Sequence, residues 1–68
     1  MARNEAGKMI RLARVEAGLT QEELARKLNV TQGTVGSWEI GIAFPRPKTM
    51  VRLCDILNIP IAELAKAG

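Results

Sequence analysis

The stretch Thr20–Glu39, TQEELARKLNVTQGTVGSWE, constrains the fold of this chain more than any other part of it. It opens on Thr20, followed three residues later by Glu23, which is the capping-box pattern of a helix start. Apolar residues at the spacing of one helix face come next: Leu24, Ala25 and Leu28. Asn29 tolerates the left-handed backbone that ends a helix. Thr31 then caps a second helix that runs to about Glu39, so the stretch predicts two short helices joined by a tight turn.

The remaining sequence predicts three more helices. A first helix starts after a cap at Asn4 and ends at Gly18, and its inward stripe is Ala6, Ile10, Ala13 and Ala17. Pro47 fits the first position of a fourth helix, whose stripe is Met50, Leu53, Cys54 and Leu57. A last short helix buries one face with Ile61, Leu64 and Ala65. The fold class is therefore all-α, a compact five-helix domain that occupies residues 1–68 as one unit.

Composition excludes several function classes. The 68 residues contain no His and no Tyr and only one Cys, Cys54, so the usual catalytic triads and most zinc sites are ruled out. Gly33 and Gly36 lack the strand and the Lys-Ser/Thr pair of a phosphate loop. We expect no enzyme, no metal, no cofactor and no small-molecule ligand. Neither a membrane span nor a leader pattern is present, and a lone cysteine fits a reducing compartment, so we expect a cytoplasmic protein.

The bent helix pair and the charge of the chain point to nucleic acid. The formal net charge is +3, and a small basic domain has nucleic acid first among its expected partners. Small Ala25 lets the two helices cross closely, while Val35 and Trp38 fill the angle between them. A pair held in this way can place its second helix in a DNA major groove. The alternative at this stage is an ordinary helical hairpin inside a bundle.

The segment GLTQEELARKLNVTQGTVGSWEIG resembles the helix-turn-helix of phage-repressor proteins, the Cro/Xre class. The resemblance continues into Ile10-Arg11 and Arg14 on one side, and on the other through Pro45 and Thr49 to the run 53–59. It covers nearly the whole chain. It implies a lambda-repressor-like domain that regulates transcription and binds palindromic operators in double-stranded DNA as a homodimer.

The resemblance also implies roles for matching residues. Gln21 matches a phosphate contact at a helix N-terminus, where free amides favour an anion. Gln32 matches a base reader and is able to pair with adenine through two hydrogen bonds. The expected base contacts are Gln32, Gly33, Thr34 and Ser37, and the expected phosphate contacts are Gln21, Thr31, Arg46 and Lys48. Arg14 and Glu39 match an internal ion pair. The expected dimer interface is Arg46, Pro47, Ile61 and Leu64.

Two departures from the family pattern support an alternative function. Gly33, Gly36 and Ser37 stand where longer polar or basic readers are common, which leaves either a close backbone approach to DNA or weak sequence selection. In the following loop, Ile40, Ile42 and Phe44 replace the usual polar or basic residues. Exposed apolar residues can mark a protein contact, although Phe44 is expected to fold onto the core. The alternative is an antitoxin-like or accessory protein-interaction module with little sequence readout.

Overall fold

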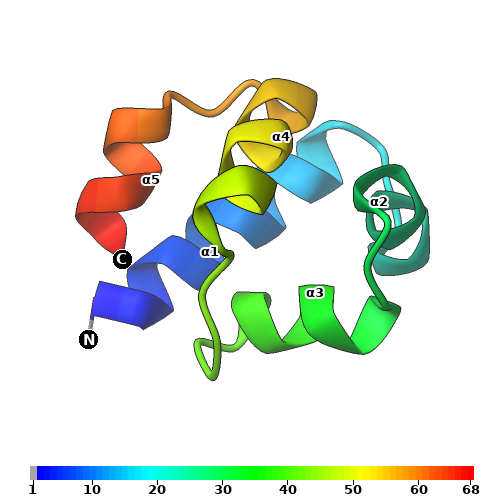
Figure 1. Cartoon of the computed structure of the whole chain (residues 1–68), viewed down its shortest axis with the longest axis horizontal. Coiled ribbons are helices and arrows are strands. Elements are labelled where there is room, and N and C mark those ends of the chain that lie inside the picture. Colours follow the sequence, from blue (N-terminus) through cyan, green and yellow to red (C-terminus); the bar gives the residue numbers. More distant parts are fainter. Residues whose placement is uncertain (1) are drawn as a thin grey trace.

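The computed structural model describes residues 2–68, and within them it contains five α-helices and no strand. The helices are α1 (Ala2–Glu16), α2 (Gln21–Leu28), α3 (Gln32–Glu39), α4 (Pro47–Leu57) and α5 (Ile61–Ala67). Figure 1 shows α3 at one edge of the molecule, with α1 running behind the centre and α5 on the side away from α2. The predicted all-α, five-helix fold is confirmed. No helix of this part of the chain combines the length and apolar character that crossing a bilayer requires.

The ends of the central helices follow the predicted local signals. Thr20 and Glu23 form the complete capping box at the start of α2. Asn29 ends α2 in the left-handed conformation with φ 59°, and Asn58 does the same after α4. Thr31 caps α3 by accepting a hydrogen bond from the Thr34 amide. One boundary differs: α1 begins at Ala2, so Asn4 lies inside the helix and is not its cap.

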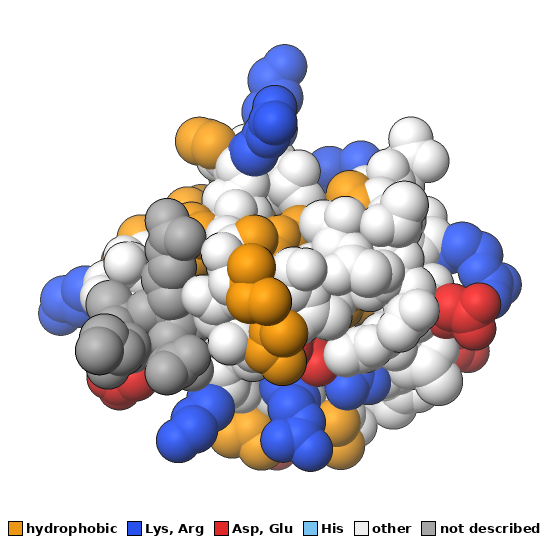
Figure 2. Space-filling model, turned by 90° about the horizontal axis from the view of Figure 1, so that it is seen from below, with side chains coloured by type: hydrophobic (Ala, Val, Ile, Leu, Met, Phe, Trp, Pro, Cys, Tyr) orange, Lys and Arg blue, Asp and Glu red, His pale blue; other side chains and the backbone are white. Residues whose placement is uncertain are grey.

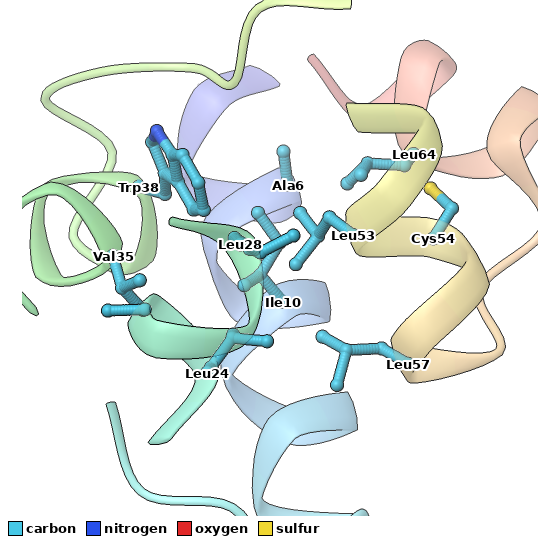
Figure 3. Packing of buried hydrophobic residues seen from close by; sticks show 11 residues of the cluster. Ala6, Ile10, Leu24, Leu28, Val35, Trp38, Leu53, Cys54, Leu57 and Leu64 are labelled. Carbon is cyan, nitrogen blue, oxygen red and sulfur yellow. The ribbon is translucent and has the colours of Figure 1, made fainter. Parts of the chain in front are cut away.

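The core is a single cluster to which all five helices contribute, and α1 packs chiefly against α3 and α5. Figure 3 shows buried side chains from α1 to α5 pointing into one cluster. Its members are Ala6, Ile10, Leu24, Ala25, Leu28, Val35, Trp38, Leu53, Cys54, Leu57 and Leu64. Ala17, Ile61 and Ala65 are exposed, so the predicted stripes of α1 and α5 are shorter than expected. Burial raises the pKa of the Cys54 thiol, which fits the small core residue predicted at that position.

Helix α1 crosses the end of α3 at Gly7. A Cβ atom on Gly7 would lie 2.5 Å from the carbonyl oxygen of Glu39 and 2.6 Å from that of Trp38. Both neighbours are backbone atoms, so a side chain here would force the two helices apart. Gly7 therefore fixes the distance between α1 and the C-terminal end of α3.

Candidate nucleic-acid interface

The N-terminus of α2 presents two backbone amides to solvent. The Thr20 amide donates to the Glu23 carboxylate at 2.8 Å, and the Glu23 amide donates to the Thr20 hydroxyl at 3.0 Å. The Leu24 amide donates to the Thr20 carbonyl. Within residues 2–68 this leaves the amides of Gln21 and Glu22 as donors without a protein acceptor. Such amides, at the positive end of the helix dipole, favour an anion.

The capping box makes the stability of this helix end depend on pH. Hydrogen bonds from the Thr20 amide and hydroxyl lower the pKa of Glu23 below its ordinary value of 4.5. A lowered folded-state pKa means that the stabilisation is present above the unfolded pKa and is lost as pH falls through the folded one. We expect Glu23→Gln, which does not titrate, to be less stable than wild type at about pH 6 and to approach it at about pH 3.

Thermal unfolding of both proteins across this range checks the expectation. Glu22→Gln is the matched control, because it removes the same charge from an exposed neighbour that makes no side-chain hydrogen bond within the described chain. A stability difference between Glu23→Gln and wild type that stays constant with pH would count against the capping box.

An ion pair ties α1 to the end of α3. The Arg14 Nε donates to the Glu39 carboxylate at 2.6 Å, and a second guanidinium nitrogen, Nη2, donates to its other oxygen at 3.3 Å. The side chains are only 13% and 3% exposed, respectively. Arg14 also donates to the Leu19 carbonyl at 2.7 Å, which holds the turn before α2. The structure thus contains the predicted internal pair, and Arg14 joins α1 both to the end of α3 and to the turn before α2.

Two glutamines extend this pair to the molecular surface. The Gln21 Nε2 donates to Glu39 at 3.0 Å, and the Gln21 Oε1 accepts from the Gln32 Nε2 at 2.8 Å. Gln21 therefore uses its amide on two protein partners, while exposed Gln32 keeps one N–H and its carbonyl oxygen for an external group. A polar groove of about 460 Å³ lies beside them, lined by Arg14, Thr20, Gln21, Glu22 and Gln32.

The outward surface of α3 offers few long side chains after Gln32. Gly33 is exposed, and a Cβ added there would meet only the Thr31 hydroxyl, at 3.9 Å. The hydroxyls of Thr31 and Thr34 are hydrogen-bonded to each other at 2.9 Å. Ser37 is partly buried. The predicted base contacts therefore lie along one helix of eight residues, with short side chains at every position after Gln32 that faces outward.

The loop after α3 carries both apolar and basic residues. Ile40 and Ile42 are exposed, whereas Phe44 packs against the core, as predicted for it. Exposed Arg46 and Lys48 stand at the start of α4. Figure 2, seen from the α3 side, shows a stripe of hydrophobic side chains beside a white polar surface, with Lys and Arg side chains above and below it.

The structure separates the residues predicted for a dimer interface. Arg46 and Pro47 lie at the beginning of α4, while Ile61 follows its other end, at the start of α5 (Figure 1). Leu64 is completely buried in the core. It therefore has no surface to offer a second copy, and its place in the predicted interface is corrected. A groove of about 610 Å³ between α4 and α5 includes exposed Val51 and Ile61.

Three structural contacts were missed from the sequence. The Arg52 Nη2 donates to the Lys27 carbonyl at 2.9 Å, which joins α4 to the end of α2. Gly7 sets the approach of α1 to α3, and Gln21 bonds to Glu39. These contacts join residues 18 to more than 30 positions apart. A glycine inside an otherwise helical pattern was the one available signal, since it commonly has a packing reason.

Comparison with known proteins gives consistent similarities. Residues 10–64 match the helix-turn-helix family. The chain is 40% identical over 55 residues to the cryptic phage CTXphi transcriptional repressor RstR of Vibrio cholerae, a match that covers 81% of this chain and 50% of that protein. It is 34% identical over 53 residues to the transcriptional regulator ImmR of Bacillus subtilis, covering 78% of this chain and 42% of that one. The chain thus spans about half the length of these curated relatives.

A solved structure shares the fold. The clp gene regulator ClgR from Corynebacterium glutamicum superimposes with a TM-score of 0.84 at 24% identity, over 98% of this chain and 71% of that one. At this identity the similarity confirms the five-helix architecture alone.

Proposed function

Because the chain belongs to the helix-turn-helix family, we propose that it is a sequence-specific regulator of transcription that binds double-stranded DNA. Its relatives RstR and ImmR are named as a transcriptional repressor and a transcriptional regulator, and we assign this chain a repressor-like role. The observation that carries the proposal is the hydrogen-bonded series from Arg14 through Glu39 and Gln21 to Gln32. The series ends at the exposed side-chain amide of Gln32, at the start of α3.

In the proposed complex, α3 lies in the major groove and the start of α2 lies on the DNA backbone. The free amides of Gln21 and Glu22 bind a phosphate. Gln32 pairs with adenine, using its remaining N–H for N7 and its carbonyl oxygen for the N6 amino group. Gly33 lets the backbone come close to the bases, while Thr34 and Ser37 contact base edges. Phosphate contacts by Thr31, Arg46 and Lys48 complete the interface.

Two copies are needed for selective binding. One short helix contacts too few bases to distinguish a genomic site, so we propose a homodimer that binds a palindrome. Half-sites are then about one helical turn of DNA apart. The proposed dimer interface contains Val51 and Ile61, which line the groove between α4 and α5. Arg46 and Pro47, at the start of α4, lie at the other end of this interface. Sedimentation of the protein with a two-half-site duplex measures the stoichiometry.

Replacing Gln32 and Gln21 by alanine should separate base reading from backbone anchoring. Gln32→Ala is expected to weaken binding to the selected site by about 1–3 kcal/mol, with random duplex bound as before. Gln21→Ala keeps the backbone amide but is expected to weaken binding to both duplexes, because it removes the remaining side-chain N–H as a phosphate donor and the bonds that hold Glu39 and Gln32 in place. Fluorescence anisotropy with labelled specific and scrambled duplexes measures both affinities.

Ala62→Ser, at an exposed position of α5, is the control variant. Equal losses on specific and scrambled duplex from both glutamine variants would contradict these roles.

A second candidate function is a protein-interaction module of the same fold, antitoxin-like or an accessory subunit. The exposed Ile40 and Ile42 favour it, because exposed apolar groups mark protein contacts. Salt dependence separates the two. A protein that neutralises several phosphates loses affinity steeply between about 50 and 200 mM salt, whereas an interaction module binds no duplex even at the lower concentration.

A further inference from the structure

Ile40 and Ile42 place apolar side chains at one end of α3. They are 65% and 69% exposed; Ile40 directly follows Glu39, the last residue of that helix, and Ile42 comes two positions later. In Figure 2 a hydrophobic stripe lies on the α3 side of the molecule, beside polar surface and between Lys and Arg side chains. Exposed Arg46 and Lys48 begin α4 a few residues later. Ile40 and Ile42 therefore lie between the C-terminal end of α3 and the basic start of α4, next to residues proposed to face DNA.

The backbone of the loop is fixed to α3. The Ile40 amide donates to the Gly36 carbonyl at 3.1 Å, and the amides of Ile42 and Ala43 both donate to the Ser37 carbonyl, at 3.0 and 3.3 Å. Gly41 takes φ 86°, which turns the chain sharply between the two isoleucines. The position of both side chains is thus set by the recognition helix itself and not by a free loop.

Helix dimensions give these side chains a defined place on DNA. Eight residues of α-helix rise about 12 Å, which equals the width of the major groove, about 12 Å. With the N-terminal residues of α3, including Gln32, at the bases, the far end of α3 lies about 12 Å away. This exceeds the groove depth of about 8.5 Å, so the far end is at the level of the groove edge. That edge consists of phosphates and of deoxyribose rings, whose carbon faces are apolar.

We propose that Ile40 and Ile42 pack against deoxyribose at the edge of the major groove. The inference rests on the proposed DNA-binding function and adds a contact to it. At this end of α3 the protein holds the backbone by burying apolar surface, while Arg46 and Lys48 hold phosphates nearby. Because no counterion is released by an apolar contact, this part of the affinity is insensitive to salt.

Serine and lysine substitutions test the contact through the salt dependence of binding. Ile40→Ser and Ile42→Ser should each weaken binding to the selected duplex about fivefold or more, with the slope of log affinity against log salt unchanged. Ile42→Lys should instead steepen that slope by about 0.9, because one more phosphate is neutralised. Val15→Ser is the matched control, since Val15 is a 57% exposed apolar residue on α1, outside the proposed DNA and dimer interfaces. Anisotropy titrations at several salt concentrations supply all the values.

Three results would overturn the proposed contact with deoxyribose. If both serine variants bind the selected duplex with the same affinity as the wild type, the apolar contact is overturned and this surface is left to a protein partner. A fall in affinity accompanied by a shallower salt slope would overturn it too, because the isoleucines would then be positioning phosphate contacts. Absence of duplex binding by the wild type at low salt would overturn the proposed function, and the apolar contact with it. Thermal unfolding of each variant verifies that it is folded.

Discussion

Replacing Arg14 by methionine is expected to lower the free energy of unfolding by about 3–5 kcal/mol. The change leaves the Glu39 carboxylate, whose side chain is 3% exposed, with Gln21 as its remaining partner. A carboxylate held away from water without its counter-charge is costly. The loss is a large share of the stability of a domain this small. Chemical denaturation of the purified variant measures it.

The double variant Arg14→Met with Glu39→Leu separates the cost of the lone charge from the net contribution of the pair. Removing both charges leaves no buried ion, so most of the lost stability should return. DNA affinity should nevertheless stay low, because Gln21 then lacks the acceptor that orients it. A double variant as unstable as Arg14→Met would contradict the view that an uncompensated Glu39 causes the loss.

Replacing Gly7 by alanine should also destabilise the protein strongly, although alanine is the better helix former. The new Cβ would lie 2.5 and 2.6 Å from two carbonyl oxygens at the end of α3. These backbone atoms have no rotamer with which to move aside, so α1 and α3 must separate. Overpacking of this kind costs about 1–3 kcal/mol. The variant should bind DNA more weakly as well, since α3 shifts.

Gly33→Ala is the matched control, because it makes the same substitution in a helix where the added Cβ has space. It should raise stability by up to about 1 kcal/mol, while it weakens DNA binding if the backbone of Gly33 lies against the bases. Thermal unfolding and anisotropy of both variants give the comparison. Equal changes in stability from the two alanines would contradict the close packing at Gly7.

Much of the fold was predictable because its signals are local. The capping box of Thr20 and Glu23, the left-handed Asn29 and the cap at Thr31 each depend on residues within one helical turn. They confirm the predicted helix pair and its turn. Membership of the helix-turn-helix family confirms the resemblance to the Cro/Xre class. The predicted pairing of Arg14 with Glu39 came from that resemblance, since their separation of 25 positions gives no local signal.

The errors and omissions concern long-range geometry. Leu64 was assigned to a dimer surface because its helix was matched to an interface, but α5 turns this side chain completely into the core. The second bond of Gln21, to Glu39, depends on how α2 and α3 cross. The role of Gly7 depends on carbonyl groups more than 30 residues away. Periodicity gives the face on which a residue lies, whereas these contacts depend on the angle between helices.

Selection of binding sites from random duplex DNA, followed by titration of the selected site, tests whether the chain is a sequence-specific DNA-binding protein. We expect enrichment of a two-fold symmetric sequence with half-sites about one helical turn apart. We also expect an affinity that falls steeply between about 50 and 200 mM salt. Recovery of no common sequence, together with no measurable duplex binding at the lowest salt, would contradict the proposed DNA-binding function.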